Sequence, residues 1–180
     1  MPLRLSRQDF QRWAEAQPAR HERVGGEAFA MAPERIAHVR LKTRIWAALG
    51  RAIRDANLHC EALGDGVTIE VDAHTDYEPD AVVNCGPRLP PEATAATTPV
   101  VVVEVLSPLP AAIDSGEKLA DDFRVPSIQH YLIVRSRRQE IIHHRRSGPD
   151  ILARVVREGT LLLDPPGIRI DLAEVYGPTP

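Results

Sequence analysis

The sequence predicts a mixed α/β protein (α+β mixed) in which helices flank a valine-rich sheet, within one domain that covers residues 1–180. Three observations favour this fold class. Residues 98–107 form an almost purely apolar, β-branched run, which is typical of a strand covered on both faces. Residues 33–57 show a helical apolar period. Residues 129–171 alternate short apolar segments with turn residues, as successive strands do.

Composition and charge narrow the functional classes. The chain is 43% hydrophobic and 26% charged, which is typical of a globular domain, and only 4% aromatic, so the core is expected to be aliphatic. A net charge of -3 gives no global basic signature for nucleic acid, although a local basic patch can still bind phosphates. The sequence shows neither a signal peptide nor a membrane span, and Cys60 and Cys85 lack metal-ligand spacing. We therefore expect a cytoplasmic protein without membrane contact, with reduced thiols.

The first 57 residues are expected to form a helix, a hairpin and a longer helix. Ser6 followed by Asp9 is typical of a helix N-cap and predicts a short helix before residue 18. The pair Gly25 and Gly26 predicts a β-hairpin over residues 20–31. The helix over residues 33–57 should start near Pro33. Its apolar face comprises Ile36, Val39, Ile45, Leu49 and Ile53, and its basic residues are Arg35, Arg40, Lys42, Arg44, Arg51 and Arg54. These basic residues form either a solvated surface or a phosphate-facing one.

The remainder is expected to supply most of the strands. Residues 67–72 alternate with period two, and residues 76–83 predict a second strand on which Glu78, Asp80 and Val82 share a face. Because Pro79 has no N–H to donate, this strand should lie at an edge, be bulged there, or begin only there. A loop over residues 86–98 leads to the buried strand, and a helix over residues 114–123 follows it. Further strands are expected at 129–134, 140–145, 151–156, 160–163 and 168–176, the last passing into a helical turn.

Glu104 is the most informative residue of the buried strand. An unpaired ionised carboxylate in a core costs on the order of several kcal/mol, so Glu104 must be protonated, paired with a cation, or bound to a metal. If the strands that carry Asp80 and Glu104 are neighbours, the two carboxylates can converge on one hard cation. The sequence therefore favours a metal site at the end of this strand.

Lys118 is the candidate cation beside such a site, because it lies on the helix that follows the buried strand. Phosphodiester hydrolysis needs positive charge near the attacking water. One alternative is a surface ion pair between Asp114 and Lys118, worth roughly a few tenths of a kcal/mol. Another is a structural domain in which Glu104 pairs with Lys118 inside the core.

Two other groups have plainer interpretations. His143 and His144 are adjacent on a strand, so their side chains should point to opposite faces and cannot easily share a zinc ion. The densest basic cluster either contacts nucleic acid or protects edge strands from aggregation. It comprises Arg135, Arg137, Arg138, Arg145 and Arg146.

Several motifs, in this order along the chain, resemble one known family. They are Pro79 with Asp80, the Val-Glu-Val-Leu-Ser-Pro segment at 103–108, the pair Asp114 and Lys118, and the strand at 129–134. Residues 22–27, with His38 on the next helix, look like the opening hairpin of the same family. Over nearly its whole length the chain is thus similar to the small restriction-endonuclease proteins of the PD-(D/E)xK nuclease superfamily.

This resemblance implies a restriction-endonuclease-like central mixed β-sheet flanked by helices, with an N-terminal helix and hairpin. It also implies nuclease chemistry on DNA with Mg²⁺ or Mn²⁺, and a homodimer. Asp80 would be the first metal carboxylate and Glu104 the second, while Val105 would contribute its backbone carbonyl. Lys118 would position the attacking water, and Glu22 would be a further acidic catalytic residue. His38 and Asp114 are accessory candidates.

The chain also departs from the family pattern. The superfamily lysine usually stands two residues after the second carboxylate, where this chain has Leu106. A hydroxyl-rich turn is replaced by residues 109–112, and a tyrosine that commonly follows the helix lysine is missing. The sequence therefore predicts a magnesium-dependent endodeoxyribonuclease. The alternative is a catalytically silent nuclease-fold module that binds nucleic acid or a protein partner.

Overall fold

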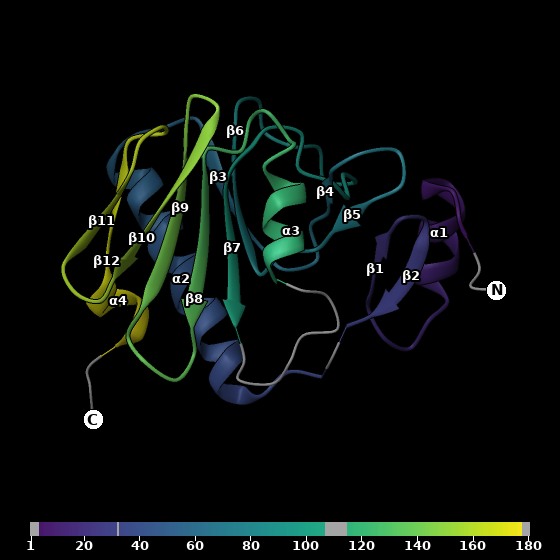
Figure 1. Ribbon diagram of the computed structural model, residues 1–180, viewed down its shortest axis with the longest axis horizontal. Helices are drawn as coiled ribbons and strands as arrows, with labels where there is room; N and C mark the ends of the chain where they lie inside the picture. Colours follow the sequence, from purple (N-terminus) through teal and green to yellow (C-terminus); the bar gives the residue numbers. More distant parts are fainter. Residues whose placement is uncertain (1–3, 32, 107–114, 178–180) are drawn as a thin grey trace.

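A six-stranded mixed sheet with helices on both faces forms the centre of the computed structural model and confirms the predicted fold class (Figure 1). The structure describes residues 4–31, 33–106 and 115–177. The order of the central strands is β10-β9-β8-β7-β6-β3, and only β7 and β8 run parallel. A smaller sheet of order β2-β1-β5-β4 lies beside α1, and β11 pairs with β12 as a separate hairpin.

Most of the predicted helices and strands are present, and β3 is a strand that the sequence analysis did not predict. The helices are α1 (Arg7–Glu15), α2 (Ile36–Asp55), α3 (Ser115–Asp122) and α4 (Leu172–Tyr176). The first six strands are β1 (His21–Val24), β2 (Glu27–Ala30), β3 (Cys60–Gly64), β4 (Ile69–Glu70), β5 (Asp76–Tyr77) and β6 (Ala81–Cys85). The others are β7 (Pro99–Leu106), β8 (His130–Arg135), β9 (Ile141–Ser147), β10 (Asp150–Val156), β11 (Thr160–Leu163) and β12 (Ile168–Asp171).

The strand β7 lies inside the sheet and is covered on both faces, as its apolar run predicts. Val101 and Val103 pack into the larger core cluster, to which α2, the β11–β12 hairpin and α4 also contribute. Val102 points the other way, into a second cluster with Tyr131 of β8 and Phe123 at the end of α3. The sheet therefore has α2 on one face and α3 on the other (Figure 1). This two-sided burial gives Glu104 its unusual setting.

Helix α2 differs in one respect from the predicted helix. It begins at Ile36 rather than in the turn of Pro33, and the first apolar positions do not reach the core, since Ile36 is 65% exposed and Val39 is 42% exposed. Lys42, expected among the basic residues of the helix surface, is instead buried. The helix ends at Asp55, and Asn57 has a left-handed backbone conformation with φ of 52°. The apolar face was therefore predicted one turn too far toward the N-terminus.

The strand expected over residues 76–83 is divided in two. β5 ends at Tyr77, and β6 begins at Ala81, so Pro79 and Asp80 lie in the connection between two different sheets. Of the three arrangements that Pro79 allows, the structure shows a strand that begins only after it. The half-buried strand predicted at residues 67–72 is shorter than expected and comprises Ile69 and Glu70 alone.

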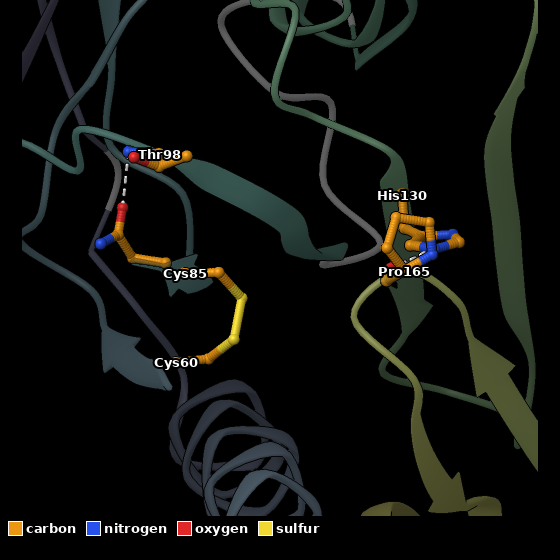
Figure 2. The surroundings of a disulfide bond; sticks show 6 residues. Cys60, Cys85, Thr98, His130 and Pro165 are labelled. Atoms are coloured by element: carbon orange, nitrogen blue, oxygen red, sulfur yellow. Dashed lines mark hydrogen bonds between the residues drawn. A yellow bond between two sulfur atoms is a disulfide. The ribbon is translucent and has the colours of Figure 1, made fainter. Parts of the chain in front are cut away.

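The prediction of reduced thiols is wrong. Cys60 of β3 and Cys85 of β6 face each other across the strand pair and form a disulfide with an S–S distance of 2.01 Å (Figure 2). The two cysteines are 25 positions apart, and no sequence pattern joins them, because their pairing depends on the register of β3 against β6. Figure 2 also shows His130 of β8 against Pro165, whose carbonyl oxygen lies 2.8 Å from His130 Nε2.

Among the described residues, no helix is both long and apolar enough to cross a membrane.

Candidate functional site

A buried ion cluster joins β1, β7 and α3. Lys118 Nζ of α3 lies 2.6 Å from Glu22 Oε1 of β1 and 2.7 Å from Glu104 Oε1 of β7. Glu22 Oε1 also accepts a hydrogen bond of 2.9 Å from the backbone N–H of Glu78. We call Glu22, Glu104 and Lys118 the Lys118 cluster. It brings together three of the residues that the sequence assigned to the site, although they come from elements far apart in the chain.

A buried ion pair fixes the strand that carries Glu22. The neighbouring Arg23 is completely buried, and its Nε donates to Asp76 Oδ2 of β5 over 2.7 Å. Arg23 also donates to the backbone oxygen of Ala73 over 3.2 Å. A charge-assisted pair of this kind restricts geometry more tightly than an exposed one. The small sheet therefore holds Glu22 against α3.

Asp80 lies beside the end of β7. Its backbone N–H donates to Val103 O over 3.0 Å, and its Oδ2 accepts from the backbone N–H of Val105 over 2.6 Å. In an extended strand the N–H and C=O of one residue point to the same edge, so the Val105 carbonyl also faces the Asp80 side. β6 and β7 are neighbours, as the convergence of Asp80 with Glu104 requires.

A second ion cluster surrounds Asp80 from the α2 side. Lys42 Nζ lies 2.5 Å from Glu34 Oε1, 2.6 Å from Asp65 Oδ2 and 3.1 Å from Asp80 Oδ1. His38, one turn earlier on α2, places Nε2 3.5 Å from Asp80 Oδ2. We call Glu34, Asp65, Asp80 and Lys42 the Lys42 cluster. Sequence reasoning missed Lys42, which it placed among the surface residues of the helix.

The sequence does hold a signal for Lys42. Only two of the 22 lysine and arginine residues are lysines, Lys42 and Lys118, and both are buried against carboxylates. An ammonium is a compact charge on a flexible stem, whereas a guanidinium is a wide planar fork. The choice of lysine at these two positions alone therefore indicates sites that need a small cation.

The pKa values of Asp80 and Asp65 in the Lys42 cluster are lowered. Burial alone would raise the pKa of Asp80, but the hydrogen bond from His38, the charge of Lys42 and the N–H of Val105 together bring it below its ordinary value. Burial likewise opposes ionisation of Asp65, yet Lys42 and Arg20 lower its pKa. Burial favours neutral Lys42, but the surrounding carboxylates raise its pKa and keep the ammonium charged.

The Lys118 cluster has the opposite balance. Burial raises the pKa of Glu104 to about 7, and Lys118 offsets this only in part because the charges of Asp80 and Glu22 add to the rise. Asp122, one helical turn after Lys118, is completely buried, and neither of its carboxyl oxygens has a hydrogen-bond partner within the described part of the chain. Burial also raises the pKa of Asp122, well above its ordinary range. One ammonium therefore serves more carboxyl groups than it can neutralise.

The donors around Asp80 fit a hard divalent cation. In the described part of the chain, Glu34, His38 and Asp80 each offer a ligand atom, and these atoms all lie within 4.8 Å of one another. Carboxylate oxygens suit hard cations such as Mg²⁺ or Mn²⁺, whereas an imidazole nitrogen also suits Zn²⁺ or Fe²⁺, so the donor set alone does not select one metal. Glu104 lies outside this group of three, and its pKa is raised because burial, with the charges of Asp80 and Glu22, outweighs its pairing with Lys118.

Of the residues that the sequence assigned to the site, the structure places Glu22, His38, Asp80, Glu104, Val105 and Lys118 around the end of β7. Asp114 lies outside the described residues, as do residues 109–112. Four residues that the sequence did not single out also contribute here, and they are Glu34, Lys42, Asp65 and Asp122.

The other candidate groups have structural partners. His143 Nε2 lies 2.8 Å from His130 Nδ1, while the ring of His144 meets that of Tyr131, so the two adjacent histidines point to opposite faces as predicted. Within the arginine cluster, Arg146 donates to the backbone oxygens of residues 123, 125 and 128, and Arg138 pairs with the buried Glu140. These two arginines therefore stabilise the fold.

Comparison with known proteins identifies relatives over most of the chain. Residues 7–173 match the family Uma2, described as "putative restriction endonuclease". An uncharacterized protein of Synechocystis sp. is 30% identical over 151 residues, which are 83% of this chain and 78% of the relative.

A solved structure shares the fold. It is the crystal structure of "a putative nuclease belonging to DUF820" from Anabaena variabilis, with a TM-score of 0.77. The match covers 97% of this chain and 98% of the other at 14% sequence identity. At this low identity the likeness concerns the fold alone.

Proposed function

The chain belongs to the Uma2 family of restriction-endonuclease-like proteins, and we propose that it is a metal-dependent nuclease that hydrolyses phosphodiester bonds in DNA. The observation that carries the proposal is the meeting of Asp80, Glu104 and Lys118 at one end of β7. A buried group of carboxylates and a lysine costs stability, and such an arrangement is expected where chemistry requires it.

In this proposal Asp80 and Glu104, with the Val105 carbonyl, hold Mg²⁺ or Mn²⁺. His38 and Glu34 are accessory ligands on the α2 side. When bound, the cation would polarise a phosphoryl oxygen and lower the pKa of a coordinated water. The raised pKa of Glu104 supports this assignment, because a divalent cation would favour the ionised carboxylate that burial disfavours.

Lys118 would orient the attacking water. An ammonium has three N–H donors, and Glu22 and Glu104 direct two of them. The third can donate to a water or to a phosphoryl oxygen. The ring of Tyr77 lies 5.2 Å from Lys118 Nζ and limits the positions that the side chain can reach. Glu22 would then be a catalytic-site residue that holds Lys118 in place.

DNA would approach along the N-terminal part of α2. Arg35 and Arg40 are exposed and lie in sequence beside Glu34 and His38, which contact the Lys42 cluster. Guanidinium groups bind phosphate oxygens well, and such contacts would place the scissile phosphate over Asp80. This assigns to the exposed arginines of α2 the phosphate-facing role that the sequence left open.

A cleavage panel tests the function. Wild-type protein is incubated with single-stranded, duplex and branched DNA in the presence of Mg²⁺ or Mn²⁺, in parallel with Asp80→Asn, Lys118→Met and a chelator control. We expect metal-dependent cleavage by wild type alone. Equal cleavage by Lys118→Met would show contamination or a wrong assignment of the lysine.

Metal binding separates the two functional classes. Calorimetry with Mn²⁺ should show saturable binding that Asp80→Asn or Glu104→Gln removes. Metal and DNA binding without cleavage of any substrate would instead favour the catalytically silent module. Absence of metal binding that depends on Asp80 would contradict the nuclease assignment.

The dimer is proposed from an exposed strand edge. β10 is one edge of the central sheet, and Ile151, Leu152 and Val155 on it are 41%, 55% and 49% exposed. An exposed apolar edge strand is a common docking surface for a second copy. Light scattering of wild type and of a Leu152→Lys, Val155→Lys variant tests this, and we expect a dimer and a monomer, respectively.

Two further expectations stay predictions. One is that residues 1–180 form a single domain. The other is a cytoplasmic location, against which the Cys60–Cys85 disulfide counts, because such bonds are rare in reducing compartments. Titration of free thiols in protein isolated under alkylating conditions checks the redox state.

A further inference from the structure

Lys42 has no place in the nuclease scheme, although it is bound as closely as Lys118. It is 7% exposed and reaches the first metal carboxylate, Asp80, from the α2 side of the sheet. It is also one of only two lysines in a chain whose other basic side chains are arginines. A lysine ammonium is compact and pivots on a flexible stem, so it can occupy a site and leave it again.

The ammonium and the candidate metal share two ligands. Lys42 Nζ lies 2.5 Å from Glu34 Oε1 and 3.1 Å from Asp80 Oδ1, and these two carboxylates also belong to the group of three that fits a cation. One ammonium and one metal ion cannot both lie between the same carboxylates, because like charges at such short range repel strongly.

The third carboxylate around Lys42 lies outside the metal group. Asp65 Oδ2 is 2.6 Å from Lys42 Nζ and 2.8 Å from Arg20 Nη1, and Asp65 comes from the turn between β3 and β4. Asp65 can keep the Lys42 ammonium paired after Glu34 and Asp80 have bound another cation. A buried ammonium that lost every partner would be strongly unfavourable, so this retained contact makes displacement feasible.

We propose that Lys42 is the resident cation of this site and sets its affinity for metal: a divalent ion that binds Asp80 and Glu34 displaces the ammonium, which stays paired with Asp65. This inference rests on the proposed function, since it takes Asp80 as a metal ligand. The site then exchanges an internal cation for an external one, and the metal-free protein avoids leaving Asp80 as an uncompensated buried charge.

Calorimetry with Mn²⁺ on the full chain tests the exchange. Lys42→Met keeps much of the side-chain volume and removes the charge, so we expect Mn²⁺ to bind about tenfold more tightly than to wild type. Arg12→Met, which removes one charge from the exposed Arg12 of α1, is the control and should leave the affinity unchanged. Circular dichroism confirms that each variant is folded.

A second pair of variants tests the role of Asp65 with Lys42 present. Asp65→Asn should weaken Mn²⁺ binding severalfold, because the displaced ammonium loses its remaining carboxylate. Glu78→Gln is the matched control, since Glu78 is the other carboxylate that Arg20 contacts and its loss changes the charge equally. In the Lys42→Met background, Asp65→Asn should have no further effect beyond that of Glu78→Gln.

The outcomes separate this inference from the nuclease proposal. If wild type binds Mn²⁺ through Asp80 but Lys42→Met binds it equally or more weakly, the resident-cation role is overturned and the nuclease proposal stands. If wild type shows no Mn²⁺ binding that Asp80→Asn removes, the resident-cation role and the nuclease proposal both fail. If Lys42→Met does not fold, the test is the comparison of the Mn²⁺ affinities of Asp65→Asn and Glu78→Gln. Equal affinities of those two variants would overturn the exchange.

Discussion

The Lys42 and Lys118 clusters lie at the same end of β7 and take their lysines from helices on different faces of the sheet, and the pKa values of Asp80 and Glu104 within them shift in opposite directions. Lys42 reaches Asp80 from α2, whereas Lys118 reaches Glu104 from α3, and these helices cover different faces (Figure 1). Each cluster contains a buried lysine bound to carboxylates. The pKa of Asp80 is lowered, while that of Glu104 is raised to about 7.

Burial raises the pKa of both carboxylates, and the difference follows from the hydrogen-bond donors and charges that each can reach. Asp80 has Lys42, His38 and a backbone N–H. Glu104 has Lys118, which it shares with Glu22. Residue type alone therefore does not decide the state of a buried carboxylate. Burial together with the nearby donors and charges decides it, and the Lys118 side of the site is the side with fewer positive charges than carboxyl groups.

The largest expected effect is on catalysis. Lys118→Met should lower the cleavage rate about a hundredfold or more, since it removes the donor that orients water and stabilises developing charge. Single-turnover cleavage at saturating Mn²⁺ measures this. Arg12→Met is the control for a general change of charge, and should cleave at the wild-type rate. A Lys118→Met variant within a few-fold of wild type would remove Lys118 from the mechanism.

The sequence predicted most of this fold because its signals are local. The buried run of β7, the Gly25 and Gly26 turn and the Ser6 cap each act through neighbours in the chain. The strands β6 and β7 are also neighbours, which is the condition on which the sequence interpretation of Asp80 and Glu104 depended.

The rest depends on contacts that no local pattern encodes. Lys42 fits a solvated helix surface in sequence, but in the fold its ammonium lies among Glu34, Asp65 and Asp80, which come from separate segments of the chain. The Cys60 and Cys85 bond depends on strand register in the same way. Helical spacing correctly grouped Ile45 and Leu49, but it could not show that the core ends before Ile36.

The next effect concerns stability without metal. Lys42→Met should lower the free energy of unfolding at neutral pH by about 3 kcal/mol, because the buried Asp80 would lose its ammonium partner and Asp65 would keep only Arg20. Lys118→Met should lower the free energy of unfolding by less than Lys42→Met does, because Glu104 can take up a proton when it loses its ammonium partner. Urea denaturation of both variants in the presence of a chelator measures the difference. A larger loss in Lys118→Met than in Lys42→Met would contradict the comparison.

The pH dependence of stability should differ between the two clusters. Glu104 has an ordinary pKa of 4.5 and a folded-state pKa of about 7, so the folded protein binds the extra proton between these values. Its contribution to stability is therefore complete below 4.5 and is lost as the pH rises through about 7. Relative to Glu104→Gln, the free energy of unfolding of wild type should fall by on the order of 2 to 3 kcal/mol as the pH rises from 4.5 to about 7.

Asp80 should show the reverse dependence. Its pKa is lowered from 3.8, so its contribution is present above that value and is lost as the pH falls through the lower folded-state pKa. Urea denaturation across an acidic to neutral series, with Glu104→Gln and Asp80→Asn in parallel, measures both slopes. Slopes of the same sign for the two residues would mean that the clusters do not differ in charge balance.

The smallest effect should come from Asp122, which belongs to the side that lacks positive charge. Burial raises its pKa well above 3.8, and its oxygens have no hydrogen-bond partner in the described residues, so ionisation in the unfolded state favours unfolding at neutral pH. Asp122→Asn removes that ionisation and should raise the free energy of unfolding by roughly 1 to 2 kcal/mol at pH 7. The gain should shrink as the pH falls toward 3.8, because Asp122 is then protonated in both states. Asp150→Asn on the exposed edge of β10 is the matched control, and a loss of stability in Asp122→Asn would mean that Asp122 is ionised and paired.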